Sequence, residues 1–379
     1  MKKIFKPLVL VLIALSLAAC HKKSVQDMAS LTEFDQTLQV HKVWSTSIGS
    51  GAHKEYLKLT PALVGSNLYV VDYSGRVAAI NANTGRKLWS TKTKQALTSG
   101  VGADANSLYV GTKGGEVLAL NASNGQLIWR APVSNEVFAA PNADSSSVLV
   151  KTLDDHLYAL NKQNGQQRWT RNEPTPNMSL RGGNPPQVSD GLVVVGFANG
   201  QLGVFNISNG EQVWKQAIAE PQGFSVMDQM VDINGSLAVK DSTVYVATYQ
   251  GVLTAIGLRS GQTLWQKDLS SYAGLAVDSQ NVYVTDAKSH VVAFNRHSGA
   301  VAWRQDKLYG RGLTGPAIVG NVLVIADSKG YVHWLSTQDG RLLARTKSGD
   351  KKGVLTTPIV SGRDVYIYSS SGDLVKYRI

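Results

Sequence analysis

The sequence contains a single cysteine, Cys20, among its 379 residues. One cysteine cannot form an intramolecular disulfide, so a disulfide framework is excluded. The apolar stretch from Leu8 to Leu17 has only ten residues, whereas a membrane-spanning helix needs roughly 20. This stretch therefore does not predict a transmembrane helix.

Motifs that signal catalysis are also missing. The sequence has no Gly-x-Ser-x-Gly, no phosphate-binding Gly-Lys-Ser/Thr and no His-Glu-x-x-His. Residues 310–315 match the dinucleotide fingerprint Gly-x-Gly-x-x-Gly, but Pro316 and Ile318 follow where a helix would have to begin. We therefore interpret 310–315 as a loop before a strand, and we predict no enzyme and no cofactor.

Side chains that could bind a metal show no suitable grouping. The spacing of the histidines is not that of a ligand set, and we expect them to lie on the surface. Asp154 and Asp155 take the hairpin position that Ser74-Gly75 fills in another repeat, which predicts a solvated turn. The seven histidines are His21, His41, His53, His156, His290, His297 and His333.

The net charge of the sequence says little about its function. Lysine and arginine number 38 against 27 acidic residues, for a formal net charge of +11. The charges are scattered and form no basic blocks, so composition does not predict nucleic-acid binding.

The N-terminus has the features of an export signal. Lysines precede the stretch from Leu8 to Leu17, which ends in Leu17-Ala18-Ala19-Cys20. This ending resembles the lipobox of bacterial lipoproteins, whose cysteine is acylated. The resemblance implies a signal peptide over 1–19, a lipid on Cys20 and a flexible tether over 20–40. Because His21 rather than Asp follows the cysteine, it also implies an anchor in the outer membrane, facing the periplasm.

Tryptophan marks a repeat. Seven of the eight tryptophans recur at intervals of 38 to 51 residues, and six of these follow a glycine by four residues. Within a repeat, the distance from an apolar strand residue such as Tyr69 to its tryptophan, here Trp89, stays at 20 residues. A period near 40 with a constant core and variable connections is typical of a β-propeller.

The repeats predict eight blades at residues 41–379. Seven units run from Leu59 to Arg345, and the seventh has Ala344 in place of tryptophan. An eighth unit stops at Ile379 without its tryptophan, while Trp44 stands before the first complete unit. We therefore expect the segment around Trp44 to complete the C-terminal blade as its outer strand, which closes the ring of four-stranded antiparallel blades.

The repeat phrase resembles two families. Its pattern Gly-x-x-x-Ala-Leu-Asn, followed by Gly-x-x-x-Trp, is similar to that of quinoprotein dehydrogenases, but the cysteine pair and carboxylate cluster of that family are not seen. Residues 179–182, 258–262 and 327–334, together with the lipobox, resemble the BamB family of lipoproteins of the outer-membrane β-barrel assembly machinery. That resemblance implies a non-enzymatic scaffold that binds BamA, other lipoproteins of the complex and nascent outer-membrane proteins.

Two long connections predict an interface. The connections after Trp169 and Trp214 exceed the common length and leave successive blades at the same position, so we expect them side by side on one face. Their mixture of apolar and charged residues is typical of protein interfaces. The second connection contributes Phe224, Met227 and Asp228 as candidates.

The BamB resemblance assigns residues within these connections. In that family a Leu-x-Leu-Arg phrase and an Asp-x-Asp pair contact the periplasmic POTRA domains of BamA. The matching positions here are Met178, Leu180, Arg181, Asp232 and Asn234. Met178 and Asn234 depart from the family pattern, which leaves any ionic role in the second phrase to Asp232. A propeller lipoprotein that serves another envelope complex is the alternative function.

Overall fold

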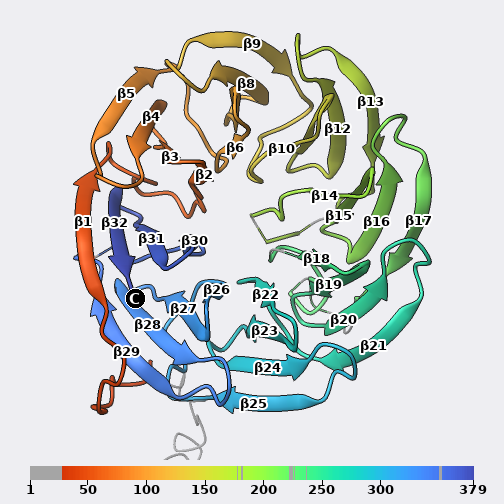
Figure 1. Ribbon diagram of the computed structural model, residues 1–379. Helices are drawn as coiled ribbons and strands as arrows, with labels where there is room; N and C mark the ends of the chain where they lie inside the picture. Colours follow the sequence, from red (N-terminus) through yellow and green to blue (C-terminus); the bar gives the residue numbers. More distant parts are fainter. Residues whose placement is uncertain are drawn as a thin grey trace, which may run out of the picture.

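The computed structural model describes residues 28–379, apart from 177, 181, 222–224, 226, 236, 350 and 351. The described strands form eight antiparallel sheets of four strands, arranged as blades around a ring (Figure 1). Seven blades use four consecutive strands, and the eighth combines the last three strands with the first. The predicted eight-bladed propeller is confirmed.

The strands have these bounds. Blades one to three contain β2 (Ala62–Val64), β3 (Asn67–Val71), β4 (Arg76–Asn81), β5 (Lys87–Lys92), β6 (Gly102–Ala103), β7 (Ser107–Gly111), β8 (Glu116–Asn121), β9 (Leu127–Pro132), β10 (Asn142–Ala143), β11 (Ser147–Lys151), β12 (His156–Asn161) and β13 (Gln167–Asn172). Blades four to six contain β14 (Gln187–Ser189), β15 (Leu192–Gly196), β16 (Gln201–Asn206), β17 (Gln212–Ala217), β18 (Ala238–Lys240), β19 (Thr243–Ala247), β20 (Val252–Gly257), β21 (Thr263–Asp268), β22 (Leu275–Val277), β23 (Asn281–Thr285), β24 (Val291–Asn295) and β25 (Val301–Gln305). Blades seven and eight contain β26 (Ala317–Val319), β27 (Val322–Ala326), β28 (Tyr331–Ser336), β29 (Leu342–Lys347), β30 (Ile359–Ser361), β31 (Asp364–Tyr368), β32 (Asp373–Arg378) and β1 (His41–Ser47).

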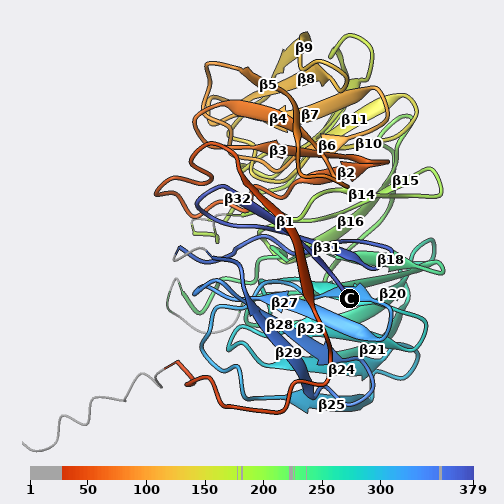
Figure 2. The ribbon, with the colours of Figure 1, turned by 60° about the vertical axis from the view of Figure 1, so that its left-hand side comes forward.

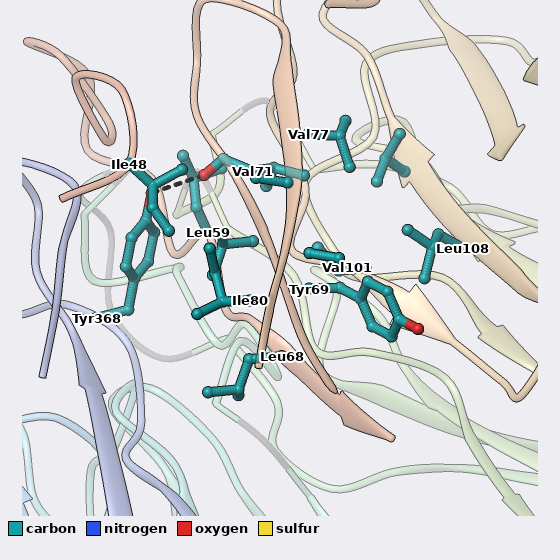
Figure 3. Close-up of a cluster of buried hydrophobic side chains, with 14 of the residues drawn as sticks. Ile48, Leu59, Leu68, Tyr69, Val71, Val77, Ile80, Val101, Leu108 and Tyr368 are labelled. Atoms are coloured by element: carbon teal, nitrogen blue, oxygen red, sulfur yellow. Dashed lines mark hydrogen bonds between the residues drawn. The ribbon is translucent and has the colours of Figure 1, made fainter. Parts of the chain in front are cut away.

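Burial follows the position of a strand in its blade. The two middle strands are buried along nearly their whole length, as in β3 and β4, because neighbouring blades cover both faces. The fourth strand, such as β5, alternates because only one of its faces is covered. Figure 3 shows one cluster with side chains from blades eight, one and two, in which the Tyr368 hydroxyl donates a hydrogen bond to the Val71 carbonyl at 2.9 Å.

The Trp–Gly phrase joins each blade to the next. The turn between the third and fourth strands of blade one starts at Asn81, whose side-chain oxygen accepts backbone N–H groups of the turn, and ends at Gly85 with φ of 72°. The ring of Trp44, from the preceding blade, covers this turn, and a Cβ on Gly85 would lie 2.7 Å from it. The Trp44 indole N–H donates to the Ala82 carbonyl at 3.2 Å. The same contact recurs around the ring. It begins with Trp89, which covers the corresponding turn of blade two, and continues to Trp303, which covers that of blade seven.

The missing tryptophan of blade seven follows from this arrangement. A tryptophan at position 344 would pack on a turn that joins the third and fourth strands of blade eight. These strands are β32 and β1, which are not consecutive in the chain, so no turn connects them. Leu38 and Val40, just before β1, instead pack against the apolar cluster that contains Ala344. Trp334, the tryptophan outside the frame, is fully buried in β28.

Pairing of β1 with β32 closes the ring. Six residue pairs run from His41 opposite Arg378 to Ser47 opposite Asp373. Lys376 of β32 is buried, forms an ion pair with Asp364 at 2.7 Å and donates to the Ala82 carbonyl of blade one at 3.1 Å. The prediction that the segment around Trp44 completes the C-terminal blade is confirmed.

Residues 28–40 pack on the ring before β1 begins. Figure 2 shows this segment crossing the lower edge of the disc and then rising into β1. The Ala29 N–H donates to the Tyr309 carbonyl at 2.9 Å, and the N–H groups of Thr37 and Leu38 donate to the Leu343 carbonyl. The Arg345 guanidinium lies over the Phe34 ring, 5.0 Å from its centroid. Residues 28–40 of the expected tether therefore contact blade seven before β1 begins.

Candidate protein interface

The two long connections are hydrogen-bonded to each other. The first, 173–186, joins β13 to β14, and the second, 218–237, joins β17 to β18. The Leu180 N–H donates to the Asp232 carboxylate at 2.9 Å, and the Asn234 amide donates to the Leu180 carbonyl at 3.0 Å. The connections therefore lie side by side, as their equivalent positions in successive blades predict.

Asp232 faces inward from this pair of connections. Its side chain is buried, and its second carboxylate oxygen has no hydrogen-bond donor among the described residues. Burial raises the pKa of Asp232 to about 6, although the Leu180 N–H partly offsets this effect. The carboxylate thus holds Leu180 in place and is not presented at the surface.

Other buried polar groups support the same region, and the sequence did not single them out. The Asn184 amide is buried and donates to the Ile233 carbonyl at 2.6 Å, which adds a third link between the connections. Lys151 forms a buried ion pair with Asp155 at 3.0 Å and donates to the Gly196 carbonyl at 2.7 Å. No local pattern marks Asn184 or Lys151, because the backbone carbonyls that they contact, those of Ile233 and Gly196, lie in the next blade or beyond.

The expectation of a solvated turn at Asp154 and Asp155 is wrong for Asp155. Its backbone is left-handed, with φ of 58°, and its carboxylate accepts the N–H of Ala198 in blade four at 3.0 Å. The turn packs against the next blade, so of the two aspartates Asp154 alone remains partly exposed.

Exposed side chains lie next to this buried support. Met178 is 49% exposed and Met227 is 65% exposed, and Asp228 is exposed beside Met227. Leu180 and Asn234 are half-buried. Arg181 and Phe224 lie outside the described residues. The predicted interface residues thus divide into exposed methionines with Asp228, and a supporting set around Asp232.

The prediction that the histidines lie on the surface is wrong for His333 and His290. His333 is fully buried, and His290 is 8% exposed and hydrogen-bonded to Asp286 at 2.7 Å. Burial lowers the pKa of His333, because the effect of burial outweighs the opposing effect of the Asp327 carboxylate at 3.1 Å.

Residues 310–315 form a loop, as predicted, and this loop brings the Arg311 guanidinium to within 2.6 Å of the Asp327 carboxylate. The Arg311 guanidinium also donates to the Ala29 carbonyl at 3.0 Å, so this cluster holds the N-terminal segment.

Metal ligands do not gather in the described part of the chain. Among those residues, no three or more His, Cys, Asp or Glu side chains are grouped to hold an ion. No helix within the same ranges is long and apolar enough to cross a bilayer.

Comparison with known proteins identifies the family. A family model described as outer membrane protein assembly factor BamB matches residues 73–305 and 287–379. The chain belongs to the BamB family. BamB of Pseudomonas aeruginosa is 42% identical over 377 residues, covering 99% of each chain. The crystal structure of BamB from Moraxella catarrhalis has a TM-score of 0.83 at 27% identity, covering 90% of this chain and 100% of that one.

Quinoproteins share the fold. The quinohemoprotein alcohol dehydrogenase of Comamonas testosteroni superimposes with a TM-score of 0.71 at 13% identity, over 89% of this chain and 76% of that enzyme. An identity this low shows common architecture alone. Membership of the BamB family, whose members are assembly factors, decides against the dehydrogenase alternative.

Proposed function

We propose that this protein is a periplasmic scaffold of outer-membrane protein assembly that docks on BamA through its two long connections. The observation that carries the proposal is the hydrogen-bonded pair of connections, in which Met178 and Met227 are exposed while Asp232 is buried. Methionine adapts its shape to a partner, and apolar residues with a charged fringe are typical of interface centres.

The resemblance to the BamB family supports BamA as the proposed partner. The positions of Met178, Leu180, Arg181, Asp232 and Asn234 correspond to the family's contacts with the POTRA domains of BamA. In this structure, Asp232 would act by holding Leu180, while Met178, Met227 and Asp228 are exposed to a partner. Nascent barrel proteins and other lipoproteins of the machinery are further proposed partners.

A pull-down with purified BamA tests the docking surface. Arg181→Glu reverses a charge in the first connection, and Met227→Glu places a charge on the most exposed methionine of the second. Loss of a central interface contact typically costs roughly 2 to 5 kcal/mol, a fall in affinity of about 30-fold or more. We expect both variants to lose BamA while their circular dichroism and melting stay near wild type.

A matched control separates this surface from a general effect of charge. Arg86→Glu makes the same charge change at an exposed turn of blade one and should retain BamA. Capture of BamA at the wild-type level by folded Arg181→Glu and Met227→Glu proteins would rule out this surface.

We propose further that Cys20 is acylated and anchors the propeller to the outer membrane. Cys20 and the signal peptide lie outside the described residues, and the proposal rests on the lipobox and on the family. Several acyl chains on one residue bind a bilayer stably, at roughly 0.8 kcal/mol per buried methylene. Cys20→Ser should no longer fractionate with membranes or incorporate labelled fatty acid. Unchanged membrane fractionation of Cys20→Ser would contradict the anchor.

A further inference from the structure

A cavity of about 470 Å³ lies at the centre of the ring. The segments that lead into the first strands of blades one to six and of blade eight contribute to its wall. Most of the wall is apolar or aromatic, including Phe138, Leu180, Tyr249 and Tyr272. Its volume lies in the range of roughly 300 to 1,000 Å³ that is typical of small-molecule sites.

Lys58 is the one charged residue in this described wall. Its ammonium donates to the Tyr272 carbonyl at 3.0 Å, and no carboxylate of the described residues pairs with it. An ammonium has three N–H donors, so this single bond leaves capacity for a ligand. Desolvation alone lowers the pKa of Lys58 to about 8, as expected for a cation without a counter-ion among the described residues.

The wall and the cation together define the chemistry of an occupant. Removing a charge from water without a partner is costly, and an anion beside Lys58 would offset that cost. Among the described wall residues, one cation in apolar surroundings suits a single negative charge, because a phosphate dianion would bring a second charge with no partner there. The rings of Tyr249 and Tyr272 meet edge to face with centroids 6.2 Å apart, and such aromatic surfaces pack well against an apolar body.

We propose that the axial cavity binds a small monocarboxylate with an aromatic or aliphatic body, whose carboxylate pairs with Lys58. Leu180 and Asn234, from the two long connections, would contact the bound molecule because both line the cavity. The proposal does not depend on BamA docking, since the cavity and Lys58 exist in the isolated propeller.

Titration calorimetry of the purified propeller with 3-phenylpropionate and heptanoate tests the site. The neutral amides of the same two molecules have nearly the same shape and no charge. We expect wild-type protein to bind the acids at least about tenfold more tightly than the amides, because only the acids pair with Lys58. Absence of binding by both acids at millimolar concentration, or equal affinity for acid and amide, would overturn the proposal.

Two lysine variants locate the charge. Lys58→Met keeps a long apolar stem and removes the ammonium, so it should lose the preference for acid over amide. Lys54→Met makes the same change at an exposed lysine four residues earlier and should bind as wild type does. Retained acid preference in a folded Lys58→Met protein would exclude Lys58 as the partner.

The pH dependence of wild-type protein provides a test that needs no variant. Among the described residues of the wall, the other titratable groups are Tyr56, Tyr249 and Tyr272, and Asp286 acts on Tyr272 from outside it. Partial desolvation in the wall raises the pKa of Tyr56 and Tyr272, so these hydroxyls stay neutral below pH of about 10. Acid affinity should therefore fall between pH of about 6.5 and 9 as Lys58 loses its proton, while amide affinity stays constant. Constant acid affinity over this range would contradict the ion pair.

Discussion

Asp232 is a buried ionisable side chain, and Lys58 is a half-buried one in the wall of the axial cavity. Burial disfavours the charged form of each group, so it raises the pKa of the carboxyl and lowers the pKa of the ammonium. The Leu180 N–H partly compensates the Asp232 carboxylate, whereas the partner of the Lys58 ammonium within the described chain is one backbone carbonyl. The two side chains therefore differ in role. Asp232 holds the two long connections together, whereas Lys58 places a positive charge in the wall of the cavity.

Replacing Asp232 with asparagine should stabilise the protein at neutral pH. The folded-state pKa of about 6 lies above the ordinary value of 3.8, so the protonated carboxyl favours folding at low pH and that contribution is lost as the pH rises through 6. The introduced amide would retain an acceptor for the Leu180 N–H without the charge. At pH of about 8 we expect Asp232→Asn to raise the free energy of unfolding by roughly 2 to 3 kcal/mol.

Urea denaturation at several pH values checks this expectation. The difference between Asp232→Asn and wild type should disappear near pH of about 4, where both forms are neutral in the folded state. Contributions of His333 and other groups cancel because both proteins contain them. A difference that does not change with pH would contradict a buried, ionised Asp232.

Strands and their turns were largely predictable from the sequence. The constant distance between strand residue and tryptophan predicts the blades because it reflects hairpins of fixed length, and the position of Trp44 predicts the closure. Buried His333 and Asp155 were missed because their burial depends on neighbouring blades and loops, which leave no periodic signal. The cavity around Lys58 was missed for the same reason.

The tryptophan contacts between blades should each contribute strongly to stability. Trp303 is 8% exposed, its indole N–H donates to the Thr337 carbonyl at 2.8 Å, and its ring covers Gly340 of blade seven. Trp303→Ala should lower the free energy of unfolding by about 3 to 5 kcal/mol, as measured by urea denaturation. Val301 of the same strand is 61% exposed, and Val301→Ala should change it by no more than about 0.5 kcal/mol. Equal effects of the two substitutions would refute the role of the tryptophan.

Closure of the ring joins the two ends of the chain and positions the candidate interface. Successive blades present their long connections at the same face, and the N-terminal segment reaches blade seven before it becomes the outer strand of blade eight. Because every blade packs on two neighbours, a ring with an unpaired outer edge at β32 would lose contacts with blade one as well. The closure strand therefore supports the whole propeller rather than one sheet.

Deleting residues 41–48 should weaken the whole molecule. The deletion removes the pairing with β32, the Trp44 contact with Gly85 and the buried side chain of Ile48. A loss of roughly 5 kcal/mol corresponds to a fall in Tm of about 7 °C for a domain of this size. Removing residues 21–27 leaves every contact described above intact and should not change the Tm. Differential scanning calorimetry of both truncations measures the contrast, and equal Tm values would show that β1 does not close the ring.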